Sequence, residues 1–548
     1  MMKSKKKSFF FLLVFMLSGC GLTIKPSTTS ESFSSFESTD EDSSSLSSLE
    51  QSSSSSVISS SSSSQSQSSS SSSSSVPDTD KRKEDYSYSP FFCEKVPNIK
   101  INTETGLDFA TVPDRLNKWD YVDCQVSVDN CDADLAMDSI DALVKVRGNY
   151  TANYEKKPLR IKFRKKQNML ALNDGNKSKS WVLLADYKDS SLLRNATSFY
   201  LGKTILGSDG FYSSDYRPVN LYLNQQYWGM YLLCEQQEAN ENRIEVSEPV
   251  EGNTSNDIGY LFEYDGYYTE ENEELGGDPT FTIDYCNHQQ LKTKDNFYVT
   301  PSMDGFTLKS DITAKTQKEF IANYMDLLYD LIYDAVYFKR YSEFDAENKK
   351  LVPSSIKSVE ELVGKYVDID SLVDIYLLNE IACNPDIAWS SFYMDIDFSK
   401  DSLKKLTFEA SWDFDSAFGL KKDNCESGKG YFAANCNNPW LIILINEPFL
   451  QEKIKEKWLE LCKYGIVKKA LNNLDLYSSL YVDDYLKNFQ RWPGSIGYCP
   501  AIDKEVREET RDFKKQKDAE TFFKDWLYLR MNYLNSVFGD SKDVLTGK

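Results

Sequence analysis

The sequence predicts an α+β protein with a mixed β-sheet in its N-terminal half and a mainly helical C-terminal half. Short segments of alternating apolar and polar residues, typical of strands, fill the region from about 98 to 235. Longer segments with apolar residues at helical spacing dominate after residue 317. Strands followed by helices in this order indicate two packed halves within one large folded region, 85–548.

The N-terminus has the three parts of a bacterial lipoprotein signal peptide over residues 1–19. A lysine-rich start precedes an apolar run at 9–17, which is shorter than the ~20 residues that span a bilayer. Ser18-Gly19-Cys20 matches the lipobox of bacterial lipoproteins, so we expect cleavage before Cys20 and lipidation of this residue. An ordinary secretory signal with a chance cysteine is the alternative. The lipobox interpretation places the protein at the extracellular face of the cell membrane, held by a lipid anchor.

Residues 20–84 are predicted to be the lipidated cysteine and a disordered tether. The stretch 27–76 is almost entirely serine, and it holds too little apolar surface to offset the entropy of ordering. A flexible chain of about 50 residues has an r.m.s. reach of roughly 40 Å. The tether therefore holds the folded region clear of the membrane.

Charge and composition argue against several classes of function. The formal net charge of −21 repels nucleic acid, so no nucleic-acid partner is expected. The single histidine, His288, argues against histidine-based triads and metal centres, and the 11 cysteines include no C-x-x-C pair typical of zinc sites. An enzyme of this composition must use carboxylates, lysine, arginine and hydroxyls. Phosphoryl transfer with Mg²⁺ and carboxylate-pair glycosidase chemistry remain.

The N-terminal half is predicted to contain strands at 142–146, 159–163 and 181–184, and a hairpin of strands at 218–223 and 229–235. A helix over 190–205 is capped by Asp189 or Ser190. The acidic, weakly periodic stretch at about 251–300 is interpreted as an insertion. The C-terminal half is predicted to contain helices at 317–337, 370–382, 438–463, 467–489 and 505–538, with a short β-ribbon at 391–395 and 405–412.

A glycine-containing loop followed by a basic strand is the first cluster that can carry chemistry. Arg147 opens the loop 147–149, and the basic residues after it include Lys157, Arg160 and Lys162. Phosphates require close approach of the backbone and positive charge, and this pattern offers both. The plainer interpretation is a half-exposed strand whose basic residues face solvent.

Acidic residues after a helix and after the ribbon form two further clusters. Asp386 follows the helix at 370–382, where it can accept a proton from an attacking hydroxyl, although Pro385 also fits a plain helix stop. Asp413 and Asp415 end the ribbon, where two carboxylates one residue apart can hold Mg²⁺ against a nucleotide phosphate. Exposed acids in a turn are the alternative interpretation of this pair.

The order of these clusters is the order in which protein kinases arrange their parts, although no G-x-G-x-x-G, H-R-D or D-F-G motif is present. Five motifs in family order resemble the CotH (spore coat protein H) kinase-like family, over about 98–538. They are R-G-N-Y-T with K-K-P-L-R-I-K at 147–162, W-V-L-L-A-D with L-R-N at 181–195, Y-L-N with Y-W-G-M-Y and Glu235 at 222–235, N-E with Asn384 and Asp386 at 379–386, and W-D-F-D at 412–415.

The resemblance implies an atypical, bilobal protein-kinase-like fold that transfers phosphate from ATP, with Mg²⁺, to protein hydroxyls. By position, Asp386 is similar to the catalytic aspartate and Asp413 to the metal-binding aspartate, with Asp415 in support. Ser391 stands five residues after Asp386, where protein kinases place a metal-binding asparagine, so the second metal ligand departs from the kinase pattern. The residues implied to bind the nucleotide are Arg147, Lys157, Arg160, Lys162 and Glu235.

The leading hypothesis is an extracytoplasmic kinase that phosphorylates serine or threonine of a surface or coat protein. The long serine tether and the acidic surface support an alternative, in which the chain is a non-catalytic surface or spore-coat binding protein that keeps the fold. A carboxylate-pair glycosidase is a third possibility, and the resemblance to CotH proteins makes it the weakest of the three.

Overall fold

The computed structural model describes residues 88–90, 93–103, 116–269, 279–285, 288, 290–302, 304–422 and 426–546. All of these belong to the unit Asp78–Lys548. The predicted signal peptide, Cys20 and the serine-rich tether lie outside the described residues. The described part is an α+β protein, with sheets first and helices after them, as the sequence predicts.

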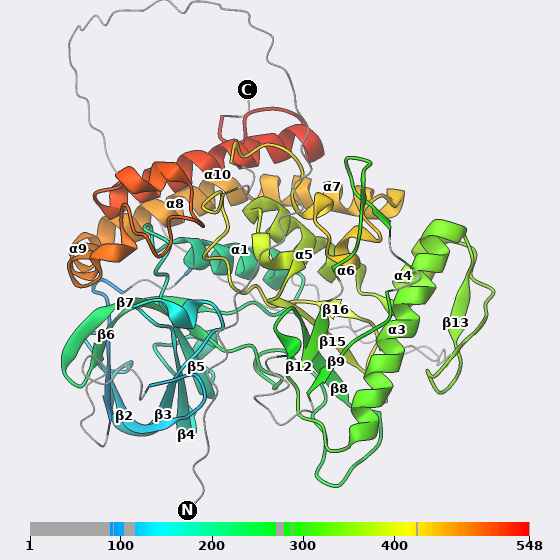
Figure 1. The fold of residues 1–548 in the computed structure, drawn as a ribbon, viewed down its shortest axis with the longest axis horizontal. Helices are drawn as coiled ribbons and strands as arrows, with labels where there is room; N and C mark the ends of the chain where they lie inside the picture. Colours follow the sequence, from blue (N-terminus) through cyan, green and yellow to red (C-terminus); the bar gives the residue numbers. More distant parts are fainter. Residues whose placement is uncertain are drawn as a thin grey trace, which may run out of the picture. The chain divides into compact units, whose positions relative to one another are not determined.

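Seven strands of the N-terminal half close into a barrel (Figure 1). In barrel order they are β1 (Asn98–Thr103), β2 (Val122–Asp129), β3 (Met137–Val146), β4 (Leu159–Gln167), β5 (Ser178–Leu184), β7 (Gln226–Glu235) and β6 (Tyr216–Leu223). Neighbouring strands are antiparallel except β1 and β6, whose parallel pairing closes the barrel. Alternate side chains, such as Val144 and Ile161, fill the interior. Arg160 and Lys162 therefore lie on the outer face of β4.

The β6–β7 hairpin confirms the predicted pair of strands, with a tighter turn than expected. Asn224 and Gln225 have positive φ angles of 46° and 69°, as a two-residue type I′ turn requires. The Asn224 side chain accepts a hydrogen bond of 2.9 Å from the backbone N–H of Thr103. This contact ties the turn to the end of β1.

A second, five-stranded sheet has the order β16-β15-β8-β12-β9. Its strands are β8 (Gly259–Asp265), β9 (Thr280–Phe281), β12 (Gly305–Leu308), β15 (Phe392–Asp397) and β16 (Thr407–Phe408). The interval 251–300, expected to be an insertion, supplies β8, which is buried along its whole length and pairs with β15. Part of this interval therefore belongs to the core. Two small hairpins complete the strands, β10 (Leu291–Lys292) with β11 (Tyr298–Val299) and β13 (Ser342–Phe344) with β14 (Leu351–Pro353).

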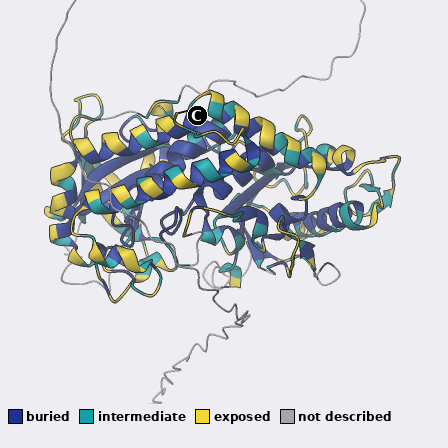
Figure 2. Ribbon diagram, turned by 90° about the horizontal axis from the view of Figure 1, so that it is seen from above, coloured by how far each residue is buried: buried dark blue, intermediate teal, exposed yellow. Residues whose placement is uncertain are grey.

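Most of the helices form a layer over the barrel and the second sheet, whereas α3 (Lys315–Phe338) runs alongside the second sheet (Figure 1). The other described helices are α1 (Arg194–Ser208), α4 (Val359–Tyr366), α5 (Ile369–Ala382), α6 (Pro439–Ile442), α7 (Pro448–Lys463), α8 (Ile466–Leu480), α9 (Val482–Arg491) and α10 (Gln516–Phe538). Helices α1 and α5 pack against each other and are buried on nearly all sides, whereas α7 to α10 expose one stripe (Figure 2). No described helix is long and apolar enough to cross a membrane.

Three predicted helices are shorter than their apolar patterns suggested. The helix expected over 438–463 breaks before Pro448, which lacks the N–H needed to continue it. The helix expected over 467–489 divides at Tyr481 into α8 and α9. The stretch 505–515 precedes α10 because its backbone pairs elsewhere, with the N–H of Arg507 bound to the carbonyl of Leu420 at 2.9 Å.

Gly229 in β7 lies where α9 touches the barrel, and we expect Gly229→Ala to destabilise the fold. Its φ is 140°, and a Cβ there would lie 2.8 Å from Trp492 Nε1 and 3.0 Å from Asn488 Oδ1. Both atoms hydrogen-bond to the β7 backbone, so neither can move freely. The free energy of unfolding should fall by about 2–4 kcal/mol, measured by thermal and denaturant unfolding of the full-length chain.

Gly207→Ala is the matched control, because a Cβ at Gly207 in α1 meets nothing within 4 Å. Alanine in a helix should raise stability by up to about 1 kcal/mol. Equal stabilities of the two variants would contradict the role given to Gly229.

Candidate functional site

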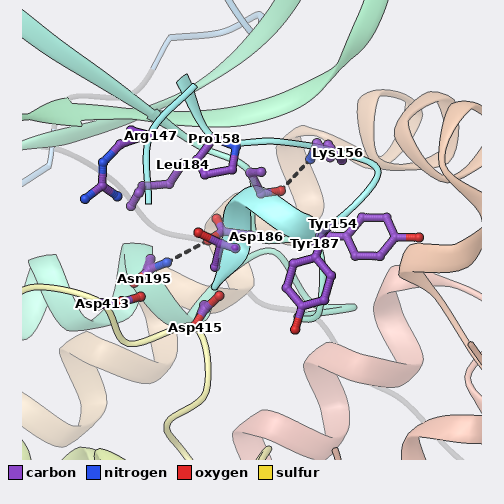
Figure 3. A pocket seen from close by; sticks show the side chains of 12 residues that line it. Arg147, Tyr154, Lys156, Pro158, Leu184, Asp186, Tyr187, Asn195, Asp413 and Asp415 are labelled. Carbon is purple, nitrogen blue, oxygen red and sulfur yellow. Dashed lines mark hydrogen bonds between the residues drawn. The ribbon is translucent and has the colours of Figure 1, made fainter. Parts of the chain in front are cut away.

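A pocket opens where the ends of β3 and β5 and the start of α1 meet the loop after β16 (Figure 3). Its lining residues are Arg147, Thr151, Tyr154, Lys156, Pro158, Leu184, Ala185, Asp186, Tyr187, Asn195, Asp413 and Asp415. Charged side chains of both signs, from segments far apart in the sequence, thus face one small space. This is the combination that phosphate and metal chemistry requires.

The loop between β5 and α1 forms one wall of the pocket. Asp186 has a positive φ of 48°, and its carboxylate accepts a hydrogen bond of 2.6 Å from Asn195 Nδ2. Asn195 Oδ1 in turn accepts one of 2.8 Å from the backbone N–H of Phe414. A single side chain at the start of α1 therefore connects the loop after β5 with the loop after β16.

Asp189 and Arg194 hold the loop between β5 and α1 in place through buried contacts. Asp189 is fully buried and accepts hydrogen bonds from the backbone N–H groups of Ser191, Leu193 and Arg194. The helix begins at Arg194 with Leu193 as its N-cap residue, later than predicted, so Asp189 holds the turn before the helix and is not its N-cap. Its carboxylate also pairs with the Arg194 guanidinium. Arg194 Nε donates a 3.0 Å hydrogen bond to the carbonyl of Ala417, so the loop after β16 is held at a second point.

The W-D-F-D segment forms the opposite wall. Asp413 has a φ of 61°, an uncommon conformation for a residue with a side chain. The Arg147 guanidinium lies 5.0 Å from the ring centre of buried Trp412. Asp415 Oδ1 lies 3.1 Å from Lys188 Nζ, and both side chains are almost fully buried. Asp413 and Arg147 are only partly buried and remain accessible from the pocket.

Asp386 is placed by the end of α5 and a short polar network. The helix stops at Cys383, which has a φ of 47°, and Pro385 opens a 3₁₀ turn, Pro385–Ala388. Asn384 Nδ2 donates to Asn379 Oδ1 at 3.1 Å, and Asn384 Oδ1 accepts from the N–H of Asp386 at 3.2 Å. The two asparagines of the motif therefore position the aspartate. Its carboxylate stays partly exposed, 4.0 Å from Lys421 Nζ.

Glu380 of the same motif has a structural role. It is fully buried, pairs with Arg530 of α10, and accepts hydrogen bonds from the backbone N–H groups of Phe432 and Ala434. These contacts anchor the end of α5 to α10 and to the 431–434 segment.

Burial and like charge control the protonation of the site. Burial, together with Asp415 and Asp386, raises the pKa of Asp413 to about 7. Burial also raises the pKa of Asp386 above its ordinary value. Burial alone would lower the pKa of Lys188, but Asp415, Asp386 and Asp413 raise it above the ordinary value for lysine. The ammonium is therefore retained, while Asp413 titrates near neutral pH.

Four of the site residues predicted from the sequence are brought together. Arg147, Asp413 and Asp415 line the pocket. Asp386 is not part of the lining, but its charge acts on both Lys188 and Asp413. These four residues thus lie close enough together for the catalytic and metal-binding roles predicted for them.

The predicted nucleotide-binding residues Lys157, Arg160, Lys162 and Glu235 lie elsewhere. Lys157 Nζ donates to the carbonyl of Ala152. Arg160 and Lys162 line a second cavity, and Arg160 pairs with Glu238 at 2.9 Å. Glu235 is fully buried against Arg243, Asn173 and the N–H of Asp215.

Ser391, the predicted second metal ligand, belongs to neither set of lining residues. Its backbone N–H donates to Glu263 Oε1 at 2.8 Å, next to β8. Its predicted role in metal binding therefore has no support from the pocket.

Lys156, Asp186, Lys188 and Asn195 are site residues to which the sequence gave no role, although all but Lys188 stand in the quoted motifs. Lys156 is fully buried, donates to the carbonyls of Ala185 and Met230, and has its pKa lowered by burial. A signal was present, because two acids and a lysine follow directly on the apolar strand at 181–184. Only the packing of the loop shows which of them face the pocket.

The fold and the site define an α+β protein whose charged, carboxylate-rich pocket lies between a β-barrel and a helical half. The sequence model of the family described as CotH kinase protein matches residues 144–534. This stretch is more than half of the chain and contains the whole site, so the chain belongs to the CotH kinase family. A comparison with curated proteins gave no match.

We expect Asp413→Asn to stabilise the metal-free protein at pH 8. The pKa of about 7 in the folded state exceeds the ordinary value of about 3.9, so the folded state binds the proton more tightly. It therefore loses stability as pH rises from about 4 to about 7, and the loss is complete above 7. Asparagine removes this loss. The melting temperature should rise on the order of 2 °C at pH 8 and by less at pH 5.

The measurement is thermal unfolding in EDTA at both pH values. The control is Asp401→Asn, which changes an exposed acid between β15 and β16. If Asp413→Asn changed the melting temperature equally at both pH values, the raised pKa assigned to Asp413 would be contradicted.

Proposed function

We propose that the protein is an atypical kinase that transfers the γ-phosphate of ATP, with Mg²⁺, to serine or threonine of a surface or coat protein. One observation carries the proposal. Arg147, Asp413 and Asp415 line one pocket, and Lys188, which pairs with Asp415, also feels the charge of Asp386, although these residues come from segments far apart in the sequence. Membership of the CotH kinase family supports the kinase-like class and a protein substrate.

A bilobal, kinase-like arrangement is part of this proposal. The barrel takes the place of the half that covers a nucleotide, and the helical half carries Asp386 after α5 and Asp413 after β16. This is the chain order of the catalytic and metal-binding aspartates in protein kinases.

The donors present suit Mg²⁺ bound together with a nucleotide. Among the described residues, no group of three or more His, Cys, Asp or Glu side chains is arranged to hold a metal ion. Mg²⁺ is commonly held by one or two carboxylates with phosphate oxygens and water as its other ligands. Asp413 and Asp415 supply hard oxygen donors of this kind, and Arg147 supplies positive charge for a phosphate.

The second cavity offers room for the rest of a nucleotide. It has a volume of about 360 Å³, within the usual range of small-molecule sites. Arg160 and Lys162 line it from the outer face of β4, and Gln237 contributes a buried carbonyl oxygen without a hydrogen-bond partner. We propose that the nucleoside end lies here, which retains a binding role for Arg160 and Lys162.

When bound, MgATP supplies the transferable phosphoryl group. In this proposal the chain's own residues do the rest. Asp386 accepts the proton of the substrate hydroxyl, aided by a raised pKa that makes its carboxylate a better base. Arg147 and Lys188 hold positive charge at the wall where negative charge develops. Asn195 keeps the walls at a fixed separation.

Phosphoryl transfer tests the proposal directly. Full-length protein is incubated with Mg²⁺, γ-labelled ATP and a basic, serine-rich protein, and labelled protein is quantified. Asp386→Ala and Asp413→Ala should each lower transfer by 100-fold or more, on the order of the contribution of a general base. Asp401→Ala, which changes an exposed acid away from the pocket, should transfer like the wild type.

Transfer that survives both site variants would refute the assigned roles. A wild-type chain that neither transfers phosphate nor is stabilised by MgATP in thermal unfolding would favour the non-catalytic binding protein instead.

We also propose that the chain is anchored to the extracellular face of the membrane through lipid on Cys20. The lipobox supports this. Expressed in a lipoprotein-processing bacterium, the wild-type chain should partition into the detergent phase of Triton X-114. Cys20→Ser should move it to the aqueous phase or the medium, whereas Cys131→Ser should not. Identical partitioning of Cys20→Ser and wild type would exclude the anchor.

A further inference from the structure

We propose that Lys188 is a built-in cation of the site that takes the place of a second divalent metal, so that the protein binds its nucleotide with a single metal ion. This inference rests on the proposed function and specifies its metal requirement. Lys188 lies on the loop between β5 and α1, and neither the motifs nor the family match assigns it a role.

The position of the Lys188 ammonium is the first observation. Its Nζ lies 3.1 Å from Asp415 Oδ1, and the two side chains are only 8% and 6% exposed. Asp386 and Asp413 also act on it electrostatically. The ammonium therefore lies among the three carboxylates that a kinase would use around its metal ions.

The loop that carries Lys188 cannot move far, which makes the charge a fixed part of the site. The next residue, Asp189, accepts a hydrogen bond from the backbone N–H of Arg194, the first residue of α1, and is fully buried with the Arg194 side chain. Two residues before Lys188, Asp186 is tied to Asn195. A bound metal ion at the Lys188 position would have to displace a side chain that is anchored on both sides.

The position of Ser391 is the second, independent observation. Protein kinases hold a second Mg²⁺ with an asparagine after the catalytic aspartate, and Ser391 occupies that position in the sequence. Here the backbone of Ser391 binds Glu263, which is itself paired with Lys309 at 2.9 Å. Ser391 is thus bound through its backbone to β8, while an ammonium from another segment, that of Lys188, already lies 3.1 Å from Asp415.

Charge balance agrees with this assignment. Lys188 and one divalent ion carry three positive charges, which equal the three negative charges of Asp386, Asp413 and Asp415 when all three are ionised. A second divalent ion would have to compete with the ammonium for Asp415, because their charges repel each other at short range in a buried site. Removal of the ammonium frees Asp415, an oxygen donor of the type that Mg²⁺ and Mn²⁺ prefer.

The test counts metal ions rather than activity. Full-length protein is titrated with Mn²⁺ in the presence of a non-hydrolysable ATP analogue, and free Mn²⁺ is followed by its EPR signal. The wild type should bind one Mn²⁺ per chain. Lys188→Met should bind two, and Lys188→Arg, which keeps the charge, should bind one. Lys365→Met, which removes a surface lysine paired with Glu343, should behave like the wild type.

Two Mn²⁺ per wild-type chain, or one per folded Lys188→Met chain, would overturn the inference. If Lys188→Met does not fold by thermal unfolding, the wild-type count and the Lys188→Arg count still decide it. Failure of the proposed function gives a different pattern, in which the nucleotide analogue causes no additional Mn²⁺ binding in any of the four proteins, and that result overturns the inference as well.

Discussion

The hydrogen bonds of Asn195 are the contact on which the site depends. Its amide donates to Asp186 and its carbonyl oxygen accepts from the backbone of Phe414, 219 residues further along the chain. Because an asparagine side chain can donate and accept at once, one residue fixes the separation of two loops. Arg194, the neighbouring residue, repeats the connection through Ala417. The walls of the pocket are thus set by the first turn of α1.

Contacts outside the first turn of α1 also hold the barrel against the helices. Trp492 and Asn488 at the end of α9 bind the backbone of β7 around Gly229. Glu505 accepts hydrogen bonds from Tyr150 and Tyr154, on the loop that follows Arg147. The stretch after α9 therefore returns to the mouth of the pocket instead of continuing as helix. This explains why residues 505–515 do not join α10. Val506 and Arg507 pair with the 420–421 segment and a short 3₁₀ turn, Glu508–Asp512, follows, which local helical spacing cannot reveal.

The sequence predicts the strands and helices where the local spacing of apolar residues determines them. It predicts the residues of the site only in part. Alternation gave the strands at 142–146 and 159–163, and the positions of Asp386 and Asp413 followed from the ends of a helix and a ribbon. Lys156 and Lys157 are indistinguishable by type and spacing, yet only Lys156 turns inward. Which of two adjacent lysines faces a pocket depends on packing between distant segments, and so does the position of Lys188.

The site concentrates negative charge that a folded protein would otherwise avoid, because each buried carboxylate loses hydration. The chain meets this cost with fixed groups: Lys188 at Asp415, Arg194 at Asp189 and Asn195 at Asp186. For Asp413, burial and the like charges of Asp415 and Asp386 raise the pKa to about 7. Asp413 lines the pocket together with Asp186 and Asp415, and a bound cation there would stabilise its charged form. The same electrostatic imbalance that makes the charged form of Asp413 costly to the fold is the feature that a bound cation would relieve.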